Sequence, residues 1–181
     1  TINLEAIIRR LEYMASPSKP HREPILGETE MVEWIRELYN LIPYIEANDS
    51  SYQNMSGKRL RGYISPIDQT LQHYLVFTPQ VAIPPDGGFP LIIVYPGSAT
   101  SRLHFLMSFH LEFKDLIDIY IREAQKHGFM VLWASARNEK TSLLRDAALF
   151  EPIRDVQKNY SINPNRIYLT GSCSRARDCI M

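Results

Sequence analysis

Three apolar runs separated by two helical patterns constrain the fold of this chain more than any other feature of its sequence. The runs are Phe89–Tyr95, Phe129–Ala134 and Ile167–Thr170. A continuous apolar run such as the first is typical of a strand covered on both faces. Between the runs, apolar residues recur at helical spacing over residues 113–126 and 144–160. This alternation predicts a parallel sheet with right-handed crossovers, whose ligand site lies beyond the carboxyl ends of the strands.

An antiparallel pair of strands is expected ahead of the first run. Apolar residues alternate with their neighbours over residues 60–64 and 71–77. The segment between them, Ser65–Asp68, has the composition of a turn. The sequence therefore predicts a sheet that opens with a hairpin and continues as parallel strands.

Two amphipathic helices are predicted before the sheet, one within residues 1–15 and one ending at Pro43. The second has an apolar stripe formed by Met31, Val32, Ile35, Leu38, Tyr39 and Ile42. We expect this stripe to pack against the following domain and not to bind a partner, because so wide a stripe normally covers its own core. The chain is thus divided into a helical N-terminal extension, residues 1–57, and an α/β domain, residues 58–181.

The composition is that of an ordinary globular protein, with 45% hydrophobic and 22% charged residues in a chain of 181. Twenty basic residues balance twenty acidic ones, so charge indicates neither nucleic acid nor an anionic membrane as a partner. No apolar run approaches the roughly 20 residues of a membrane helix, and the first thirty residues lack a secretion-signal pattern. Secreted and cytoplasmic locations both fit, since two cysteines, Cys173 and Cys179, do not indicate a redox compartment.

The last apolar run leads into a turn of small residues, Gly171-Ser172-Cys173-Ser174. A strand that feeds a helix through such a turn directs backbone N–H groups and the positive end of the helix dipole at one point. The approach to this turn, residues 160–171 with the sequence YSINPNRIYLTG, resembles the approach to the nucleophile elbow of α/β-hydrolases of the prolyl-oligopeptidase-like and secreted-esterase (polyhydroxybutyrate-depolymerase-like) group.

The resemblance covers residues 59–181 and implies both a fold and a reaction. The implied fold is an α/β-hydrolase-like, mostly parallel sheet with an opening antiparallel hairpin, preceded here by a helical segment. The implied reaction is nucleophilic acyl transfer on a small ester or peptide substrate. Because the likeness ends just after the elbow, the sheet is expected to be truncated. Its last strand then presents an exposed apolar edge, which predicts self-association of the isolated chain.

The resemblance also implies roles for four residues. Cys173 stands at the nucleophile position, where the related dienelactone hydrolases are similar in carrying cysteine. A thiol at a helix N-terminus is biased toward the thiolate, a strong nucleophile. Gly97 and Ser98 follow the strand that ends at Tyr95, where relatives carry the oxyanion-hole loop, so the N–H groups of Ser98 and Ser174 would face an oxyanion. An ordinary strand-to-helix turn that happens to contain Gly97 remains an open alternative.

The rest of the family's machinery is not found in this sequence. Arg175 and Ala176 stand where the family carries glycines. In the family the acid and the histidine follow the nucleophile, whereas here all five histidines precede Cys173: His21, His73, His104, His110 and His127. We expect a longer parent chain to supply both groups. The alternative is an incomplete or non-catalytic hydrolase-like domain that acts by binding only.

No cofactor or metal site is predicted. His104 and His110 are six positions apart, which does not place them on one helical face, and no carboxylate or cysteine nearby completes a set of ligands. Nucleotide-binding and zinc-protease motifs are absent from the sequence. The expected ligand stays the small ester or peptide that the resemblance implies.

Overall fold

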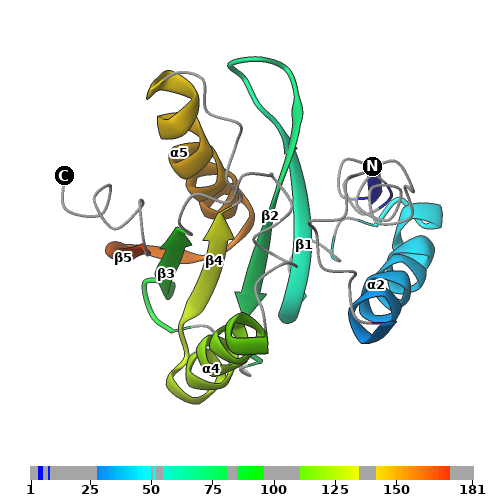
Figure 1. Ribbon diagram of the computed structural model, residues 1–181, viewed down its shortest axis with the longest axis horizontal. Helices are drawn as coiled ribbons and strands as arrows, with labels where there is room; N and C mark the ends of the chain where they lie inside the picture. The colour runs from blue at the N-terminus through cyan, green and yellow to red at the C-terminus, as the bar shows by residue number, and fades with distance from the viewer. Residues whose placement is uncertain are drawn as a thin grey trace.

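The computed structural model describes residues 4, 5, 8, 28–49, 51, 55–80, 85–95, 111–134 and 142–171. These residues form a five-stranded sheet with helices on both faces (Figure 1). The order of the strands across the sheet is β1-β2-β4-β3-β5. The three described positions within residues 1–15, namely 4, 5 and 8, are helical, in agreement with the helix predicted there.

The sheet opens with the predicted hairpin. Strand β1 spans Gly57–Ile64 and strand β2 spans Leu71–Thr78, and the two pair antiparallel. Ser65 closes the turn between them, because its N–H donates to the carbonyl oxygen of Thr70 at 2.9 Å and its carbonyl oxygen accepts from the N–H of Gln69 at 2.9 Å. The alternating pattern of the sequence thus located both strands and their turn.

The remaining strands are β3 (Phe89–Tyr95), β4 (Met130–Ala134) and β5 (Ile162–Gly171). Strand β3 lies between β4 and β5 and is parallel to both, whereas β4 pairs antiparallel with β2. Because β1 also runs against β2, β2 alone is reversed and the other strands share one direction. The α/β class, the mostly parallel sheet and the opening hairpin are therefore confirmed.

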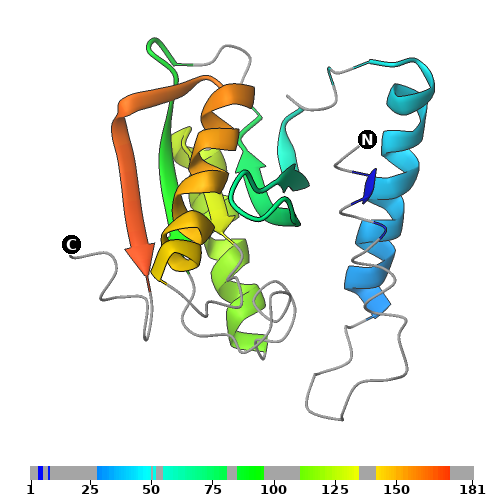
Figure 2. The ribbon, with the colours of Figure 1, turned by 90° about the horizontal axis from the view of Figure 1, so that it is seen from above.

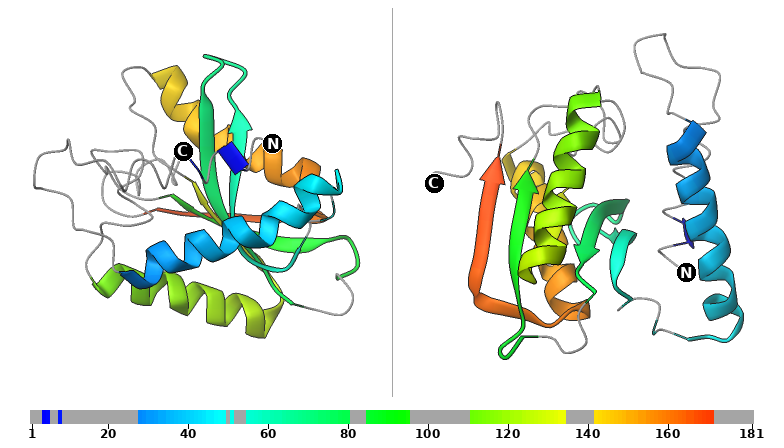
Figure 3. Two further views of the ribbon diagram at one scale, coloured as in Figure 1. Left: turned by 90° about the vertical axis from the view of Figure 1, so that its right-hand side faces the viewer. Right: turned by 90° about the horizontal axis from the view of Figure 1, so that it is seen from below.

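Two crossover helices cover opposite faces of the sheet (Figure 3). Helix α4 (Leu111–His127) joins β3 to β4, and helix α5 (Ser142–Asn159) leads from β4 past β3 to β5. The two connections move across the sheet in opposite directions, so right-handed crossovers place their helices on different faces. The core is accordingly divided: Trp133 packs with Ala124 of α4, and Leu132 packs with Val156 of α5.

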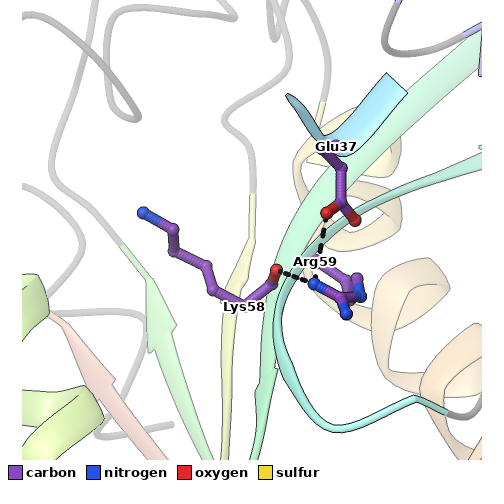
Figure 4. Close-up of polar contacts among 3 residues, drawn as sticks. All are labelled: Glu37, Lys58 and Arg59. Atoms are coloured by element: carbon purple, nitrogen blue, oxygen red, sulfur yellow. Dashed lines mark hydrogen bonds and ion pairs between the residues drawn. The ribbon is translucent and has the colours of Figure 1, made fainter. Parts of the chain in front are cut away.

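Helix α2 (Glu28–Glu46) lies beside β1, at the end of the sheet opposite β5 (Figure 2). Its buried Leu41 joins the cluster that contains Leu60 and Trp133. An ion pair reinforces this contact, since Arg59 Nη1 donates to Glu37 Oε2 at 3.1 Å and to the carbonyl oxygen of Lys58 at 3.0 Å (Figure 4). The helical segment and the sheet therefore share one hydrophobic cluster; the division of the chain at residue 57 stays a prediction.

The prediction that the apolar stripe of α2 faces the core was wrong for four of its residues. Val32 is 50% exposed, Ile35 and Ile42 are each 38% exposed, and Tyr39 is 69% exposed, whereas Leu38 packs against the core. The helix is apolar on two sides, and a pattern of spacings cannot show which side is buried. Glu37 on the inner side also reads as polar in the sequence, although Arg59 neutralises it there.

The predicted end of this helix at Pro43 was also wrong, because α2 continues to Glu46. Proline has no N–H, so it removes one helical hydrogen bond, and its ring crowds the carbonyl group four residues earlier. The carbonyl oxygen of Pro43 still accepts from the N–H of Ala47 at 3.0 Å. One lost bond near the C-terminus does not stop a helix whose inner side is held by Leu41 and Glu37.

Candidate active site

The carboxyl ends of the parallel strands meet at one edge of the sheet. Val94 of β3 is opposite Trp133 of β4 and Thr170 of β5, and Tyr95 is opposite Gly171. Helix α4 follows β3 in the chain and helix α5 follows β4, and these two helices cover opposite faces of the sheet. Neighbouring strands followed by helices on opposite faces mark the topological switch point at which open α/β sheets bind ligands.

The predicted site residues follow these strand ends directly. Gly97 and Ser98 come two and three positions after Tyr95, and Cys173 and Ser174 come two and three positions after Gly171. All four lie outside the described residues. The structure thus brings together the two strand ends from which the predicted loops start, and the roles of the four residues stay predictions.

Which residue of β5 lies opposite the end of β3 depends on how β5 begins beside β3. Phe89 pairs with Ile162 and Leu91 pairs with Ile167, so several residues of β5 are accommodated opposite Pro90 alone. The segment Asn163-Pro164-Asn165 lies within this irregularity, and there the N–H of Asn165 donates to Asn163 Oδ1 at 3.0 Å. The long irregular entrance brings the regular part of β5 into register with the end of β3.

Gly88 lies at the point where β5 begins beside β3, and it allows the two strands to approach closely. It has a φ of 92°, in the region that favours glycine. A Cβ at this position would lie 2.7 Å from the carbonyl carbon of Ile162 and 2.8 Å from the carbonyl oxygen of Ser161. The next residue, Phe89, donates its N–H to the carbonyl oxygen of Ser161 at 2.8 Å. The close approach of β5 to β3 therefore requires glycine here.

A polar seam between the hairpin and α5 was missed by the sequence analysis. Tyr74 of β2 donates its hydroxyl to Asp155 Oδ2 at 2.6 Å, and Ser65 Oγ donates to Glu151 Oε1 at 3.0 Å. Tyr74 is opposite Ala134, the last residue of β4, so the seam reaches the carboxyl edge of the sheet. Glu151 and Asp155 are four positions apart on α5, which places them on one helical face. The four-residue spacing of Glu151 and Asp155 was the feature of the sequence from which the seam could have been predicted.

Burial decides what the seam can do chemically. Burial, together with the neighbouring Asp155 carboxylate, raises the pKa of Tyr74 far above its ordinary value of 10.0. Burial likewise raises the pKa of Tyr160, whose ring lies 5.7 Å from the guanidinium of the buried Arg61. Both phenols therefore stay protonated near neutral pH. Tyr74 acts as a hydrogen-bond donor that fastens the hairpin to α5, and not as an acid or base poised for proton transfer.

The described histidines lie in other surroundings. His127 is at the exposed end of α4, with its Nε2 at 3.5 Å from Glu123 Oε2. His73 lies in β2 opposite Gly62. His21, His104 and His110 lie outside the described residues. Within the described part of the chain, no group of three or more His, Cys, Asp or Glu residues could hold a metal ion.

No helix in the described ranges has both the length and the apolar character that crossing a membrane requires.

Comparison with known proteins yields no family model and no curated protein that matches this chain. Among solved structures it is similar to the fluorophosphonate-binding serine hydrolase F of Staphylococcus aureus, at 14% identity over 64% of this chain and 46% of that one, with a TM-score of 0.47. It is similar to the CE1 ferulic acid esterase of Anaeromyces mucronatus at 13% identity over 67% and 53% of the two chains, with a TM-score of 0.45. The hyperthermophilic esterase of Pyrobaculum calidifontis gives 17% identity over 79% and 44%, with a TM-score of 0.43.

The chain thus spans about half the length of these three proteins or less. At such low identities and TM-scores, the likenesses carry no argument about activity.

Proposed function

We propose that residues 58–181 form an α/β-hydrolase-like domain that acts on ester or peptide bonds by nucleophilic acyl transfer. In this proposal Cys173 is the nucleophile, and the backbone N–H groups of Ser98 and Ser174 donate to the oxyanion, with Gly97 giving the first loop its close turn. The acid and the histidine come from outside this chain. The finer assignment to the prolyl-oligopeptidase-like or polyhydroxybutyrate-depolymerase-like group rests on the sequence resemblance alone.

The register of β3 and β5 is the observation that carries the proposal. An acyl-transfer site needs a nucleophile on one loop and an oxyanion donor on another, both directed at one reacting carbon. Tyr95 and Gly171 are paired neighbours, and two residues of chain span at most about 7 Å. A nucleophile two residues beyond Gly171 and a donor loop beyond Tyr95 would therefore start from adjacent points at the edge of the sheet.

The proposal is tested by the reactivity of the two cysteines. The chain is incubated at neutral pH with iodoacetamide and, separately, with a fluorophosphonate, and the modified residue is identified by mass spectrometry. We expect the adduct at Cys173 to form at least about tenfold faster than at Cys179, because a thiol at a helix N-terminus has a larger thiolate fraction. Cys179 is the matched control, since it lies six positions further along the same segment.

Two variants complete this experiment. Cys173→Ser should abolish the fast phase with iodoacetamide, whereas Cys179→Ser should leave it unchanged. Equal and slow labelling of both cysteines in the native chain would contradict the proposal. The catalytic assignment of Cys173 would then be dropped.

A non-catalytic hydrolase-like domain is the second candidate, and one sequence observation favours it. Arg175 occupies the position at which the family's elbow carries glycine so that strand and helix can approach closely. A side chain of this length opposes that approach. Under this alternative the domain binds a ligand at the carboxyl edge of the sheet and does not convert that ligand to a product. Cys173 then reacts no faster than Cys179.

We also propose that the chain associates through the outer edge of β5. Strand β5 is the last in the sheet, and in the described part of the chain only β3 pairs with it. Tyr168, in the middle of its regular portion, is 53% exposed. Unpaired N–H and carbonyl groups beside exposed apolar residues favour pairing with another strand. A Tyr168→Lys variant should lose the association that runs through this edge and keep any association through other surfaces.

A further inference from the structure

Helix α2 carries a second apolar stripe that faces away from the sheet. We call it the outer stripe, and its members are Val32, Ile35, Tyr39 and Ile42, which are 38–69% exposed. The inner side of the same helix is already occupied, because Leu41 is buried in the core and Glu37 is paired with Arg59. The attachment of α2 to its own domain therefore does not depend on the outer stripe.

The spacing of the outer stripe is that of a helix-pairing seam. Its members follow one another at three, four and three positions, which is the alternation of the a and d positions in a heptad. Residues at these positions form one narrow line along a helix and interlock with the same line on a second helix. Four consecutive positions of this kind, all exposed, indicate a helix as the occupant.

The spacing of the stripe is also the same in both directions, although the residues at symmetric positions differ. Val32 and Ile42 lie at equal distances from position 37, and so do Ile35 and Tyr39. A two-fold axis beside position 37 would therefore place Val32 next to Ile42 of a second copy, and Ile35 next to Tyr39 of that copy. Self-complementarity about a two-fold axis is the property that an interface between identical chains requires.

We propose that the outer stripe is a homodimer interface in which α2 packs antiparallel against α2 of a second copy of this chain. Tyr39 supplies the largest share of the buried area and lies near the axis, where residues of an interface contribute most. This interface lies at the opposite end of the sheet from β5 and is independent of the proposed acyl-transfer site.

The exposed area sets the strength of this dimer. From the exposed fractions and the usual size of these side chains, the outer stripe offers on the order of 300 Å² per copy. With the polar residues at its margin, two copies bury roughly 1,000 Å², at the lower limit of specific interfaces. The dissociation constant is therefore expected to be on the order of 100 µM, in the range of weak and reversible dimers.

The test is sedimentation velocity of the whole 181-residue chain over a concentration series extending severalfold above this dissociation constant. The native chain should pass from monomer to dimer. Ile35→Lys and Tyr39→Glu should each weaken association at least tenfold, because each places a charge in the seam. Circular dichroism of both variants should match the native chain, since the replaced side chains are 38% and 69% exposed.

The double variant tests the antiparallel register. In the proposed dimer, the lysine introduced at position 35 faces the glutamate introduced at position 39 of the second copy, and this pair occurs twice. The double variant should therefore associate at least about threefold more tightly than either single variant. A parallel arrangement would bring like charges together and weaken association further. Asn40→Glu, on an exposed position outside the stripe, is the control and should leave the dimer unchanged.

Three results would overturn the inference. The first is a native chain that stays monomeric throughout the series. The second is a double variant no tighter than the single ones. The third is association that Tyr168→Lys abolishes and the outer-stripe variants do not, since this would assign it to the edge of β5.

Discussion

Replacing Gly88 with alanine should destabilise this protein far more than the same change at its neighbour Gly87. Both glycines have positive φ, 76° for Gly87 and 92° for Gly88. An alanine at either position carries a backbone cost of about 1–2 kcal/mol. This backbone cost is the same in both variants and cancels in the comparison. The difference in their free energies of unfolding therefore measures the cost of contacts around the added methyl group.

Those surroundings differ sharply. At Gly87 the nearest atom to an added Cβ is Asn163 Nδ2 at 3.5 Å, an ordinary contact with a side chain that can move. At Gly88 the three nearest atoms lie at 2.7, 2.8 and 2.9 Å and all belong to the backbone of residues 161–163. The methyl group can be accommodated only if the start of β5 moves away from β3. Overpacking of this kind costs about 1–3 kcal/mol.

We therefore expect Gly88→Ala to lower the free energy of unfolding by about 2–5 kcal/mol in total, and Gly87→Ala by about 1–2 kcal/mol. Urea unfolding followed by circular dichroism measures both. In thermal unfolding the difference corresponds to about 2–4 °C per kcal/mol for a chain of this size. Gly128→Ala is a second control, because Gly128 has a φ of 70° and no atom within 4 Å of an added Cβ.

Equal losses in the three alanine variants would refute this reasoning. Such a result would mean that the strain lies in φ alone and that β5 does not approach β3 as closely as described. If the loss at Gly88 is the largest, the labelling rate of Cys173 becomes informative in the same variant. A shifted β5 should then slow labelling, since the proposed site depends on the register of Tyr95 with Gly171.

Three further predictions concern the seam and the contact of α2 with the sheet. Tyr74→Phe should cost about 1.5–3 kcal/mol in urea unfolding, because it removes a hydrogen bond to a charged carboxylate; Tyr168→Phe, at an exposed position, should cost nothing measurable. The folded pKa of Tyr74 is raised above its unfolded value of 10.0, so its stabilising effect is complete below pH 10 and is lost as the pH rises further. Stability measured from pH 8 to 11 should fall at the alkaline end, and less steeply in Tyr74→Phe; identical slopes would contradict the assignment. Glu37→Gln should lower stability by about 1.5–3 kcal/mol by weakening the hydrogen bond to Arg59, whereas Glu46→Gln at the exposed end of α2 should have little effect.

The elements of the fold could largely be predicted from the sequence because their signals are local. The run Phe89–Tyr95 and the alternation in residues 71–77 are patterns typical of strands, and the order of side chains records them directly. The alternation does not show that β2 is buried on both faces from Tyr74 to Thr78. The orientation of α2 could not be predicted in this way. Both of its sides are apolar, and the decisive inner residue, Glu37, is buried only because Arg59 arrives from a different element.

The polar seam shows a second limit of sequence reasoning. Tyr74 and Asp155 are 81 positions apart. Nothing in the sequence around either residue indicates that the other is its hydrogen-bond partner. The predicted site residues depend on a different kind of information. Cys173 and Ser98 were assigned from a family resemblance. The structure describes the strand ends that precede them and not the two residues themselves, so both assignments stay predictions.

The position of β3 between β4 and β5 also has a consequence for the order in which this chain folds. The hairpin of β1 and β2 joins neighbouring segments and can form early, whereas Tyr95 meets Gly171 only after α4, β4 and α5 have been laid down between them. Contacts between segments distant in sequence form slowly. Strand β5 is therefore expected to be the last to dock, and until it does the edge of β3, with its apolar residues, is open to other chains. Misassembly during refolding should thus depend on how quickly the entrance of β5 closes around Gly88.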